Sequence, residues 1–434
     1  MATKSIDIIT LGCSKNLVDT ERLMGRLEAL GYKCHHDPEL PKAPVAIVNT
    51  CGFIGDAKEE SINTILQFAE RKTQGKLQKL YVMGCLSERY LKELEDEIPE
   101  VDGWYGKFNY EGILTAIEPT EACPSGITRR HLTTPRHYAY LKISEGCNRF
   151  CSYCAIPLIT GRHTSRPIEE IVDEVQWLAQ NGVKELNIIA QDLSSYGLDI
   201  YGSHRLPELV DKIADIKDIE WIRLHYAYPA DFPEQLLDVM ARRSNVCKYL
   251  DLAVQHSTDH MLSLMRRHIT TAEQDALIER IREKVPGICI RTTLMVGHPG
   301  ETEQDFEELK SWVKKMRFDR LGTFAYSDEE GTYANKHYKD DVPDEVKQRR
   351  LSEIMDIQQR ISEEMTAQKI GQIVRVIIDR QDGDYYIGRT EFDSPEVDQE
   401  VLINKKDNGE LRLGEFYTVK ITNTEAFDLY ATLC

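Results

Sequence analysis

Residues 144–154 read Ser-Glu-Gly-Cys-Asn-Arg-Phe-Cys-Ser-Tyr-Cys, and the cysteines of this stretch, Cys147, Cys151 and Cys154, form a C-x3-C-x2-C triplet. Thiolates at such a short spacing can hold three corners of a four-iron cluster. No fourth cysteine follows nearby, so one iron would have no protein ligand. An iron that is open in this way can bind a cofactor or substrate, and the triplet therefore predicts a cluster that does chemistry.

Two other uses of these cysteines fit less well. A structural zinc site closes with four ligands, and the nearest downstream histidine, His163, lies nine residues after Cys154. A disulfide with one spare thiol is weaker still. The chain has 11 cysteines, which in a reducing compartment indicate metal or redox work rather than a disulfide framework.

The composition is that of an ordinary soluble globular protein. The 434 residues are 41% hydrophobic and 29% charged, enough for two or three domains that each bury a core. The first residues resemble neither a signal nor a transit peptide, and no apolar run approaches the roughly 20 residues of a membrane span. We therefore expect a cytoplasmic protein. Its net charge of -18 disfavours a large nucleic-acid footprint and suits a basic protein partner.

The first part of the chain repeats one pattern three times. Apolar strand candidates at 5–13, 43–51 and 80–85 end in Cys13, Cys51 and Cys85, with helical periodicity at 17–30 and 56–71 between them. Alternating strands and helices predict a doubly wound parallel sheet, whose ligands gather at the carboxyl ends of the strands. Three cysteines at equivalent strand ends favour a second iron-sulfur cluster over core packing. The remaining cysteines are interpreted as structural: Cys34, Cys123, Cys247, Cys289 and Cys434.

A second α/β region follows a linker rich in proline, glycine and threonine at 119–137. Strand candidates and helical segments alternate after it, and the cysteine triplet follows the first strand. Six such units predict a partial parallel barrel, with the residues after each strand lining one face. The strands are expected at 137–143, 185–191, 220–226, 248–254, 288–296 and 320–326, and the helices at 167–180, 208–216, 272–284 and 303–316.

Polar residues follow the other barrel strands. They are Gln191, Asp192, His225, Tyr226, Gln255, His256 and the run Gly297-His298-Pro299-Gly300-Glu301-Thr302. Glu301 suits either the acidic first turn of a helix or a ligand contact. His225 and His256 could each be a satisfied core residue or touch substrate or cofactor.

The last part of the chain changes to an alternating pattern. A long amphipathic helix is expected at 343–370, followed by short strands at 372–378, 385–391, 399–404 and 415–433, the last with a break. These predict a small antiparallel barrel of the oligonucleotide-binding kind. From Thr366 to Cys434 the chain has eight Lys and Arg against thirteen Asp and Glu. For a barrel that would hold RNA, this charge has the wrong sign.

The order of these features, strand-end cysteines, then the C-x3-C-x2-C barrel with Tyr153 before its last cysteine, then a small barrel, is similar to the methylthiotransferases of the radical S-adenosylmethionine (SAM) superfamily. The resemblance covers essentially the whole chain. It implies an N-terminal cluster domain at 4–121, a radical SAM core at 133–363 and a TRAM domain at 366–434. The fold class that follows is α/β, with a parallel sheet, a partial (β/α)6 barrel and a small β-barrel.

The resemblance also implies the chemistry and its parts. Two SAM molecules are used, one as methyl donor and one as radical source, with two 4Fe-4S clusters, and a methylthio group replaces an unactivated C–H hydrogen. The catalytic cluster would be held by Cys147, Cys151 and Cys154, and the auxiliary cluster, which relays or carries the inserted sulfur, by Cys13, Cys51 and Cys85. SAM contacts are expected at Tyr153, Gly297, Gly300 and Glu301. A reductant such as flavodoxin or ferredoxin and a sulfur donor are implied partners.

Two branches of this family differ in substrate. One modifies an adenosine of tRNA and tends to have Gly-Cys-Gln-Met-Asn after the first strand and Gln-Ser-Gly-Ser in the barrel. The other methylthiolates the β-carbon of an aspartate in small-subunit ribosomal protein twelve, a strongly basic protein. Four stretches look like this second branch: Leu11-Gly12-Cys13-Ser14-Lys15-Asn16, Ala155–Gly161, Ile189–Gly197 and Val254-Gln255-His256-Ser257.

The acidic small barrel agrees with a basic protein substrate. One departure is His298, where the family pattern has Phe. The alternative enzyme is a tRNA adenosine methylthiotransferase. A non-enzymatic iron-sulfur redox sensor is a remote alternative, because a sensor needs neither an open iron nor polar residues at six strand ends.

Overall fold

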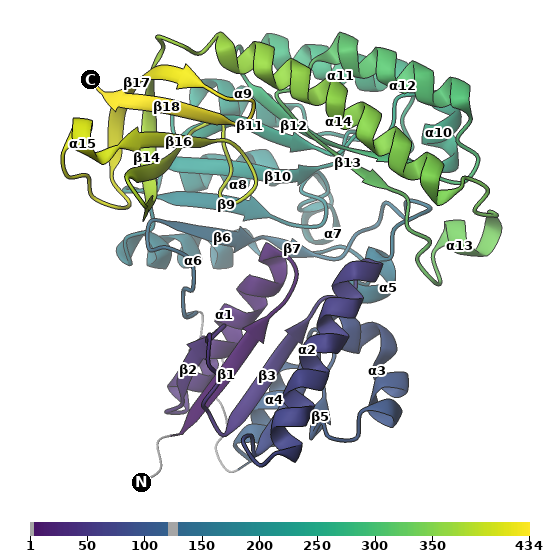
Figure 1. Cartoon of the computed structure of the whole chain (residues 1–434), viewed down its shortest axis with the longest axis vertical. Helices are drawn as coiled ribbons and strands as arrows, with labels where there is room; N and C mark the ends of the chain where they lie inside the picture. Colours follow the sequence, from purple (N-terminus) through teal and green to yellow (C-terminus); the bar gives the residue numbers. More distant parts are fainter. Residues whose placement is uncertain (1–3, 120–128) are drawn as a thin grey trace.

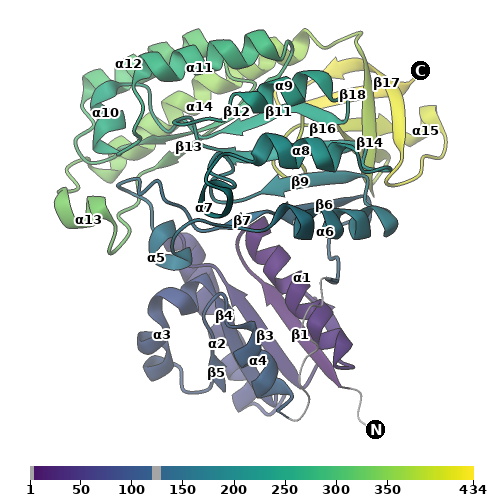
Figure 2. The same ribbon diagram turned by 180° about the vertical axis from the view of Figure 1, so that it is seen from behind.

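The structure is a computed structural model that describes residues 4–119 and 129–434. A five-stranded sheet, a six-stranded sheet and a closed small barrel follow one another along the chain. Figure 1 shows the first sheet below the second, with β1 and β3 pointing toward it, and the small barrel at one end of the second sheet. Figure 2 shows the same layers from behind, with the helices of the second sheet on its outer face.

The first sheet is parallel throughout, as the alternating pattern predicts. Its strands are β1 (Ser5–Thr10), β2 (Lys33–His36), β3 (Val45–Thr50), β4 (Lys79–Gly84) and β5 (Gly103–Trp104), in the order β2-β1-β3-β4-β5. The helices are α1 (Ser14–Ala29), α2 (Gly55–Thr73), α3 (Cys85–Glu97) and α4 (Tyr110–Ile117). Ile6, Ile8 and Ile47 pack on one face of the sheet, and Ala46 and Val48 pack on the other. Burial on both faces is what makes these strands continuous apolar runs.

The predicted strand positions are confirmed, with one local difference. The strands end before the cysteines: Cys13 is the N-cap residue of α1, and Cys85 is the first residue of α3. Strands β2 and β5 and helices α3 and α4 were not predicted from the sequence. Elements β2, β5 and α4 are short, whereas α3 has helical periodicity that was overlooked.

The second sheet is the predicted partial barrel. It contains β6 (Tyr138–Lys142), β9 (Glu185–Ile189), β10 (Trp221–Ala227), β11 (Val246–Leu252), β12 (Cys289–Val296) and β13 (Arg320–Ala325), all parallel, in the order β13-β12-β11-β10-β9-β6. The longer helices around it are α6 (Ile168–Gln180), α8 (Leu206–Ala214), α9 (Gln235–Arg242), α11 (Thr271–Lys284), α12 (Glu303–Met316) and α14 (Asp344–Ala367). Shorter pieces are β7 (Ser144–Glu145), β8 (Thr164–Ser165), α5 (Ile156–Thr160), α7 (Leu198–Tyr201), α10 (Asp259–Leu264) and α13 (Tyr333–His337).

Alternate residues of the barrel strands face opposite sides. Leu224, Leu250 and Ile290 belong to the large apolar cluster shared with the helices. Their neighbours Arg223 and Tyr249 contact the small barrel instead. The period-two alternation of strands therefore gives this sheet an apolar outer face and a polar inner one.

The small barrel is closed. Its strands are β14 (Ile373–Asp382), β15 (Tyr385–Thr390), β16 (Glu400–Asn404), β17 (Phe416–Thr424) and β18 (Asp428–Leu433), with one short helix, α15 (Lys405–Asn408). Val376, Val401 and Val419 lie in its core. Four of its five pairings are antiparallel, whereas β16 and β18 pair in parallel. The expectation of an antiparallel barrel was wrong for the pairing of β16 with β18. This pairing closes the barrel between two strands that are not adjacent in the chain.

The cysteines interpreted as structural have different surroundings. Cys247 and Cys289 are buried in a cluster beneath the small barrel, and Cys34 is half-buried. Cys434 is exposed, so it has no core role. Cys123 and the Pro124-Ser125-Gly126 part of the linker lie outside the described residues.

None of the helices in residues 4–119 and 129–434 is long and apolar enough to cross a membrane.

Candidate active site

The first set of thiols lies at the carboxyl edge of the first sheet. Strand β3 lies between β1 and β4, which places Cys51 between Cys13 and Cys85. Cys13 lies within electrostatic range of Cys51, and both of these thiols lie within electrostatic range of Cys85. Gly12 has a φ of +89°, and a Cβ there would come 2.8 Å from the Cys51 sulfur. Only glycine allows this close approach.

Asn16 ties the three cysteine loops together. Its side-chain nitrogen donates to the carbonyl oxygens of Leu11 and Thr50, at 3.1 and 2.9 Å. Its side-chain oxygen accepts from the Cys85 sulfur at 3.5 Å. Asn16 is buried, so one amide fixes the positions of all three strand ends.

The surroundings of Cys13, Cys51 and Cys85 shift the pKa values of the three thiols in different directions. Burial raises the pKa of Cys51, and it raises the pKa of Cys85 to about 12. Desolvation by the surrounding chain would also raise the pKa of Cys13, but the Lys15 charge and the Asn16 N–H outweigh it, and the pKa of Cys13 is lowered. Cys13 is therefore the thiol of this set that ionises most easily.

The second set follows β6 at the mouth of the barrel. Cys147 and Cys151 are buried and Cys154 is half-buried. Arg267 donates to the Cys151 sulfur at 3.2 Å and lies 4.0 Å from the centre of the Tyr228 ring. The backbone N–H of Arg149 points at the Cys147 sulfur, 3.4 Å away. Donors aimed at sulfur are what a cysteine thiolate that binds iron needs around it.

Without metal, the Cys147 and Cys154 thiols hold their protons. Burial raises the pKa of Cys147 to about 12, and it raises the pKa of Cys154 still further. A metal ion supplies the positive charge that ionises a buried thiol, so metal binding would release protons here.

Both thiol sets fit iron-sulfur clusters better than single metal ions. Among the residues that the structure describes, no three His, Cys, Asp or Glu side chains converge closely enough to hold one ion. A cluster differs in that each thiolate binds a separate iron. Three thiols per set, sulfur-directed donors and a glycine cradle at Gly12 are consistent with that requirement.

Buried ion pairs hold the first sheet against the barrel. Lys142 of β6 pairs with Asp19 of α1, and Lys107 pairs with Glu145 at 3.2 Å. On the other side, Glu329 receives Arg89 at 3.0 Å and Lys58 at 2.8 Å. The Lys107 ammonium interacts electrostatically with Cys85 and Cys13 of the first thiol set. It also interacts with Glu145, two residues before Cys147 of the second set. The two thiol sets therefore lie on facing edges of the two sheets.

Three family models match consecutive parts of the chain. The Radical SAM superfamily matches residues 141–313, Uncharacterized protein family UPF0004 matches 5–106, and the TRAM domain matches 370–434. A protein of Phocaeicola vulgatus named "Ribosomal protein uS12 methylthiotransferase RimO" is 63% identical over 433 residues, covering 100% of both chains. A Bacteroides fragilis protein of the same name is 62% identical, also covering 100% of both. The chain belongs to the RimO family.

Solved structures share the fold at low identity. The radical S-adenosylmethionine methyltransferase TsrM from Kitasatospora setae has a TM-score of 0.55 at 15% identity, covering 74% of this chain and 75% of that one. The cobalamin-dependent radical enzyme OxsB has a TM-score of 0.52 at 10% identity, covering 82% of this chain and 56% of that one. Both support the α/β architecture of the RimO-family chain.

The residues predicted to contact SAM are largely engaged by the protein itself. Glu301 is buried, binds Arg350 at 2.7 Å and His256 at 3.1 Å, and accepts from the Gly297 N–H. Helix α12 begins at Glu303 with Thr302 as its cap, so Glu301 precedes the helix instead of lying in its first turn. The Cα hydrogens of Gly297 and Gly300 face the Lys347 and Leu264 side chains.

Tyr153 is the member of this group that lies beside the cysteines, with its hydroxyl 3.5 Å from Arg267. Its SAM contact, and those of Gly297, Gly300 and Glu301, stay predictions.

The two strand-end histidines are both buried and hydrogen-bonded. His256 contacts Glu301 and the Thr258 N–H, so it lies in a satisfied core network. His225 contacts Asn187 at 3.2 Å on the inner face of the barrel. Burial and the neighbouring Arg223 charge keep the pKa of His225 well below its usual range. It is a neutral imidazole on the barrel interior.

Sequence reasoning missed Arg267 and Arg149. The run Met265–His268 is a weak signal, because basic pairs usually lie on solvated surfaces, and only the fold brings Arg267 over Cys151. Arg149 lies inside the cysteine triplet and pairs with Asp192 at 2.8 Å, which holds the triplet loop against the β9 strand end. Asp192 was noted as a strand-end residue, but its partner could not be deduced from spacing.

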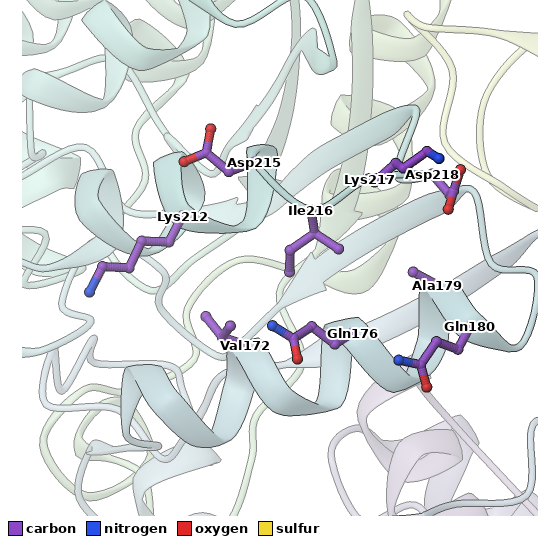
Figure 3. A pocket seen from close by; sticks show the side chains of 9 residues that line it. All are labelled: Val172, Gln176, Ala179, Gln180, Lys212, Asp215, Ile216, Lys217 and Asp218. Carbon is purple, nitrogen blue, oxygen red and sulfur yellow. The ribbon is translucent and has the colours of Figure 1, made fainter.

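The surface hollow shown in Figure 3 is unrelated to these residues. It has a volume of about 580 Å³ and lies between α6 and α8 on the outer helical layer, lined by side chains such as Gln176, Lys212 and Ile216. No cysteine lines it.

Proposed function

We propose that this chain is a radical SAM methylthiotransferase that modifies the β-carbon of an aspartate in ribosomal protein uS12. The observation that carries the proposal is the pair of three-thiol sets on facing edges of the two sheets, in a chain that matches RimO proteins from end to end. One set would hold a cluster with an iron open for SAM, and the other would hold the cluster that supplies or relays sulfur. Both are needed to insert a methylthio group.

The cofactors are two 4Fe-4S clusters and SAM. We propose that Cys147, Cys151 and Cys154 hold the catalytic cluster and that Cys13, Cys51 and Cys85 hold the auxiliary one. When bound, the first cluster with SAM supplies the radical that takes a hydrogen from an unactivated C–H bond, and the second supplies or relays sulfur. The chain would hold these groups in position.

The surrounding side chains have separate tasks. Arg267 places a positive charge on the Cys151 sulfur, which would stabilise the more negative, reduced state of a cluster bound there. Asn16 holds the three N-terminal cysteine loops at fixed separations. Tyr153, Gly297, Gly300 and Glu301 are proposed to shape the SAM side of the mouth, Glu301 by holding the turn through the Gly297 N–H.

The protein substrate is favoured over tRNA by charge. Eight Lys and Arg stand against thirteen Asp and Glu between Thr366 and Cys434, which suits a basic ribosomal protein and would repel a phosphate backbone. A reductant such as flavodoxin or ferredoxin and a sulfur donor complete the reaction. A ribosomal protein substrate supports a cytoplasmic location for the enzyme.

Mass spectrometry on two candidate substrates tests the proposal. Reconstituted enzyme, SAM, sulfide and a reductant are incubated without oxygen with uS12 and, separately, with unmodified tRNA. A methylthio mass gain on the aspartate peptide alone is expected. A gain on tRNA alone would assign the chain to the RNA branch, and no consumption of SAM in either mixture would favour a redox sensor.

The two cluster assignments predict different losses. Cys151→Ala should abolish SAM cleavage, because it removes a ligand of the proposed catalytic cluster. Cys51→Ala should retain SAM cleavage and lose sulfur insertion. Counting 5′-deoxyadenosine and methylthiolated product by mass spectrometry separates the two, with Cys434→Ala, an exposed terminal cysteine, as the matched control. Methylthiolated product from the Cys51→Ala protein would contradict the assignment.

A further inference from the structure

Lys15 lies at the boundary between the two thiol sets. It is the second residue of α1, two positions after Cys13, and it is half-buried. Its ammonium nitrogen lies 3.5 Å from the centre of the Tyr226 ring, at the end of barrel strand β10. The side chain therefore crosses from the first sheet to the mouth of the barrel.

The charge of Lys15 is not neutralised by an ion pair with any residue that the structure describes. Two other lysines at the same boundary behave differently: Lys107 and Lys142 both pair with Asp19 and Glu145. The field of Lys15 reaches His225 and Asp251 on the barrel interior. A half-buried cation that faces a reaction space and makes no ion pair is positioned for an anionic ligand.

The backbone of Tyr226 has a strained conformation that directs its side chain toward Lys15. Tyr226 has a φ of +64°, in the left-handed region, and the pairing of β10 with β11 shifts register between Leu224 and Ala227. Such a conformation costs about 1–3 kcal/mol in a non-glycine residue and gathers at functional sites. Bulges of this kind redirect a side chain. Here the result is a half-exposed tyrosine ring that faces Lys15.

These contacts define a site for a carboxylate between the two thiol sets. We propose that Lys15, seated on the Tyr226 ring, binds the side-chain carboxylate of the substrate aspartate and so positions its β-carbon. The inference rests on the proposed function, in which that carbon is the one modified. The β-carbon is bonded directly to the carboxyl carbon, so an ion pair to the carboxylate fixes the reacting atom one bond away. Lys15 is thus a positioning residue that also selects an acidic side chain over a neutral one.

Peptide binding tests this role directly. Two fluorescent peptides span the modified position of uS12, one with the native Asp and one with Asn. Their dissociation constants are measured by anisotropy on reconstituted wild-type protein and on Lys15→Met. The wild type should bind the Asp peptide roughly tenfold to a hundredfold more tightly than the Asn peptide. The Lys15→Met protein should bind both with similar affinity, and its kcat/KM for the Asp peptide should fall by a similar factor, chiefly through KM.

Control variants separate this role from a structural one. Lys4→Met changes a lysine of the same sheet that lies 5.1 Å from the Tyr32 ring and pairs with Glu118, at the opposite end of β1. It should leave the Asp preference unchanged. Iron content and absorption spectra are compared for every variant. If the Lys15→Met protein does not assemble its clusters, three other variants test the role: Lys15→Arg, Tyr226→Phe and Tyr226→Leu. Lys15→Arg and Tyr226→Phe should keep much of the preference for the Asp peptide. Tyr226→Leu should reduce that preference severalfold.

The outcomes also distinguish this inference from the proposed function. The role of Lys15 is overturned if the Lys15→Met protein folds, contains its clusters and still prefers the Asp peptide over the Asn peptide as strongly as the wild type. That outcome leaves the proposed function intact. Failure of the wild-type enzyme to methylthiolate the Asp peptide and whole uS12, with activity on tRNA, overturns the function itself.

Discussion

At the scale of single residues, His298 shows how a departure from the family pattern is accommodated. Its ring is fully buried among Tyr326, Tyr338 and Tyr153, and its Nε2 lies 3.0 Å from the Ser152 hydroxyl, inside the cysteine triplet. A phenylalanine would fill the same aromatic box but could not bind Ser152. The histidine therefore keeps the packing of the pattern and adds a hydrogen bond to the triplet loop.

His298 predicts a pH dependence of stability. Burial lowers its pKa to about 4, from an ordinary value of about 6.5. The folded protein holds the ring neutral, so this contribution to stability is complete above about pH 6.5 and is lost as the pH falls toward 4. Between pH 7 and pH 5 the loss from this one group is about 2 kcal/mol. The free energy of unfolding is measured in urea at both pH values. Between pH 7 and pH 5 it should fall by about 2 kcal/mol less in His298→Phe than in the wild type.

His337→Phe is the matched control for this comparison. His337 is exposed and stacks on Tyr333 with ring centres 4.0 Å apart, an arrangement that phenylalanine can keep. Its replacement should leave the pH dependence as in the wild type. Equal losses of stability in His298→Phe and wild type would contradict the account given for His298.

At the scale of secondary-structure elements, helix α12 depends on its first turn. Thr302 accepts from the Asp305 N–H at 3.1 Å, and Asp305 accepts from the Thr302 N–H at 3.0 Å, which is a complete capping box. Asp305 also accepts from Thr258, at 3.0 Å. The cap therefore fixes both the start of α12 and the neighbouring segment after β11.

Thr302→Ala should lower the free energy of unfolding by about 1–2 kcal/mol, because it removes the capping oxygen. Ser311→Ala, in the middle of the same helix, is the control. Ser311 is exposed and its hydroxyl donates to the Glu307 carbonyl of its own helix, so alanine should change stability by less than about 0.5 kcal/mol. Denaturant unfolding measures both. Equal effects of the two substitutions would show that the cap contributes nothing.

The elements that sequence could predict are those with strong apolar periodicity. The six barrel strands and helix α12 lie within a few residues of their expected positions, because each buries an apolar stripe in one core. Short elements such as β2 and β5 were missed, since two to four residues carry no period. Spacing also suggested the two cysteine sets. It could not suggest Arg267 over Cys151 or Lys15 over Tyr226, because these pairs join residues far apart in the chain.

At the scale of the whole molecule, the small barrel closes the inner face of the partial barrel. Its segment after β15 contacts the starts of four barrel strands: Arg223 donates to the Glu391 carbonyl, Tyr249 and Arg291 bind Asp398, and Arg320 binds Asp393. The small barrel thus packs near the amino ends of the strands, away from the cysteine triplet.

One buried network contributes strongly to the rigidity of this joint. Arg389 of β15 binds both carboxylate oxygens of Glu185, at 3.0 and 2.7 Å, and its Nε binds Asp379 at 2.6 Å. Arg223 reaches the same Glu185 at 3.1 Å. The Glu185 side chain is completely buried, so it depends on these two arginines for its charge.

Arg389→Met should therefore destabilise the joint by about 3–5 kcal/mol, because it leaves buried carboxylates without their main partner. The control is Arg380→Met, which removes another arginine that binds both carboxylate oxygens of its partner, Glu400, within the small barrel, where both side chains are partly exposed. That loss should cost at most about 1 kcal/mol. Urea unfolding measures the loss of stability in each variant. Limited proteolysis should release the segment 370–434 sooner from Arg389→Met than from Arg380→Met.

Adding Glu185→Gln to Arg389→Met should restore part of the lost stability, because it removes the buried charge that Arg389 no longer compensates. Equal costs for the two arginines would mean that packing, and not this network, fixes the small barrel on the inner face.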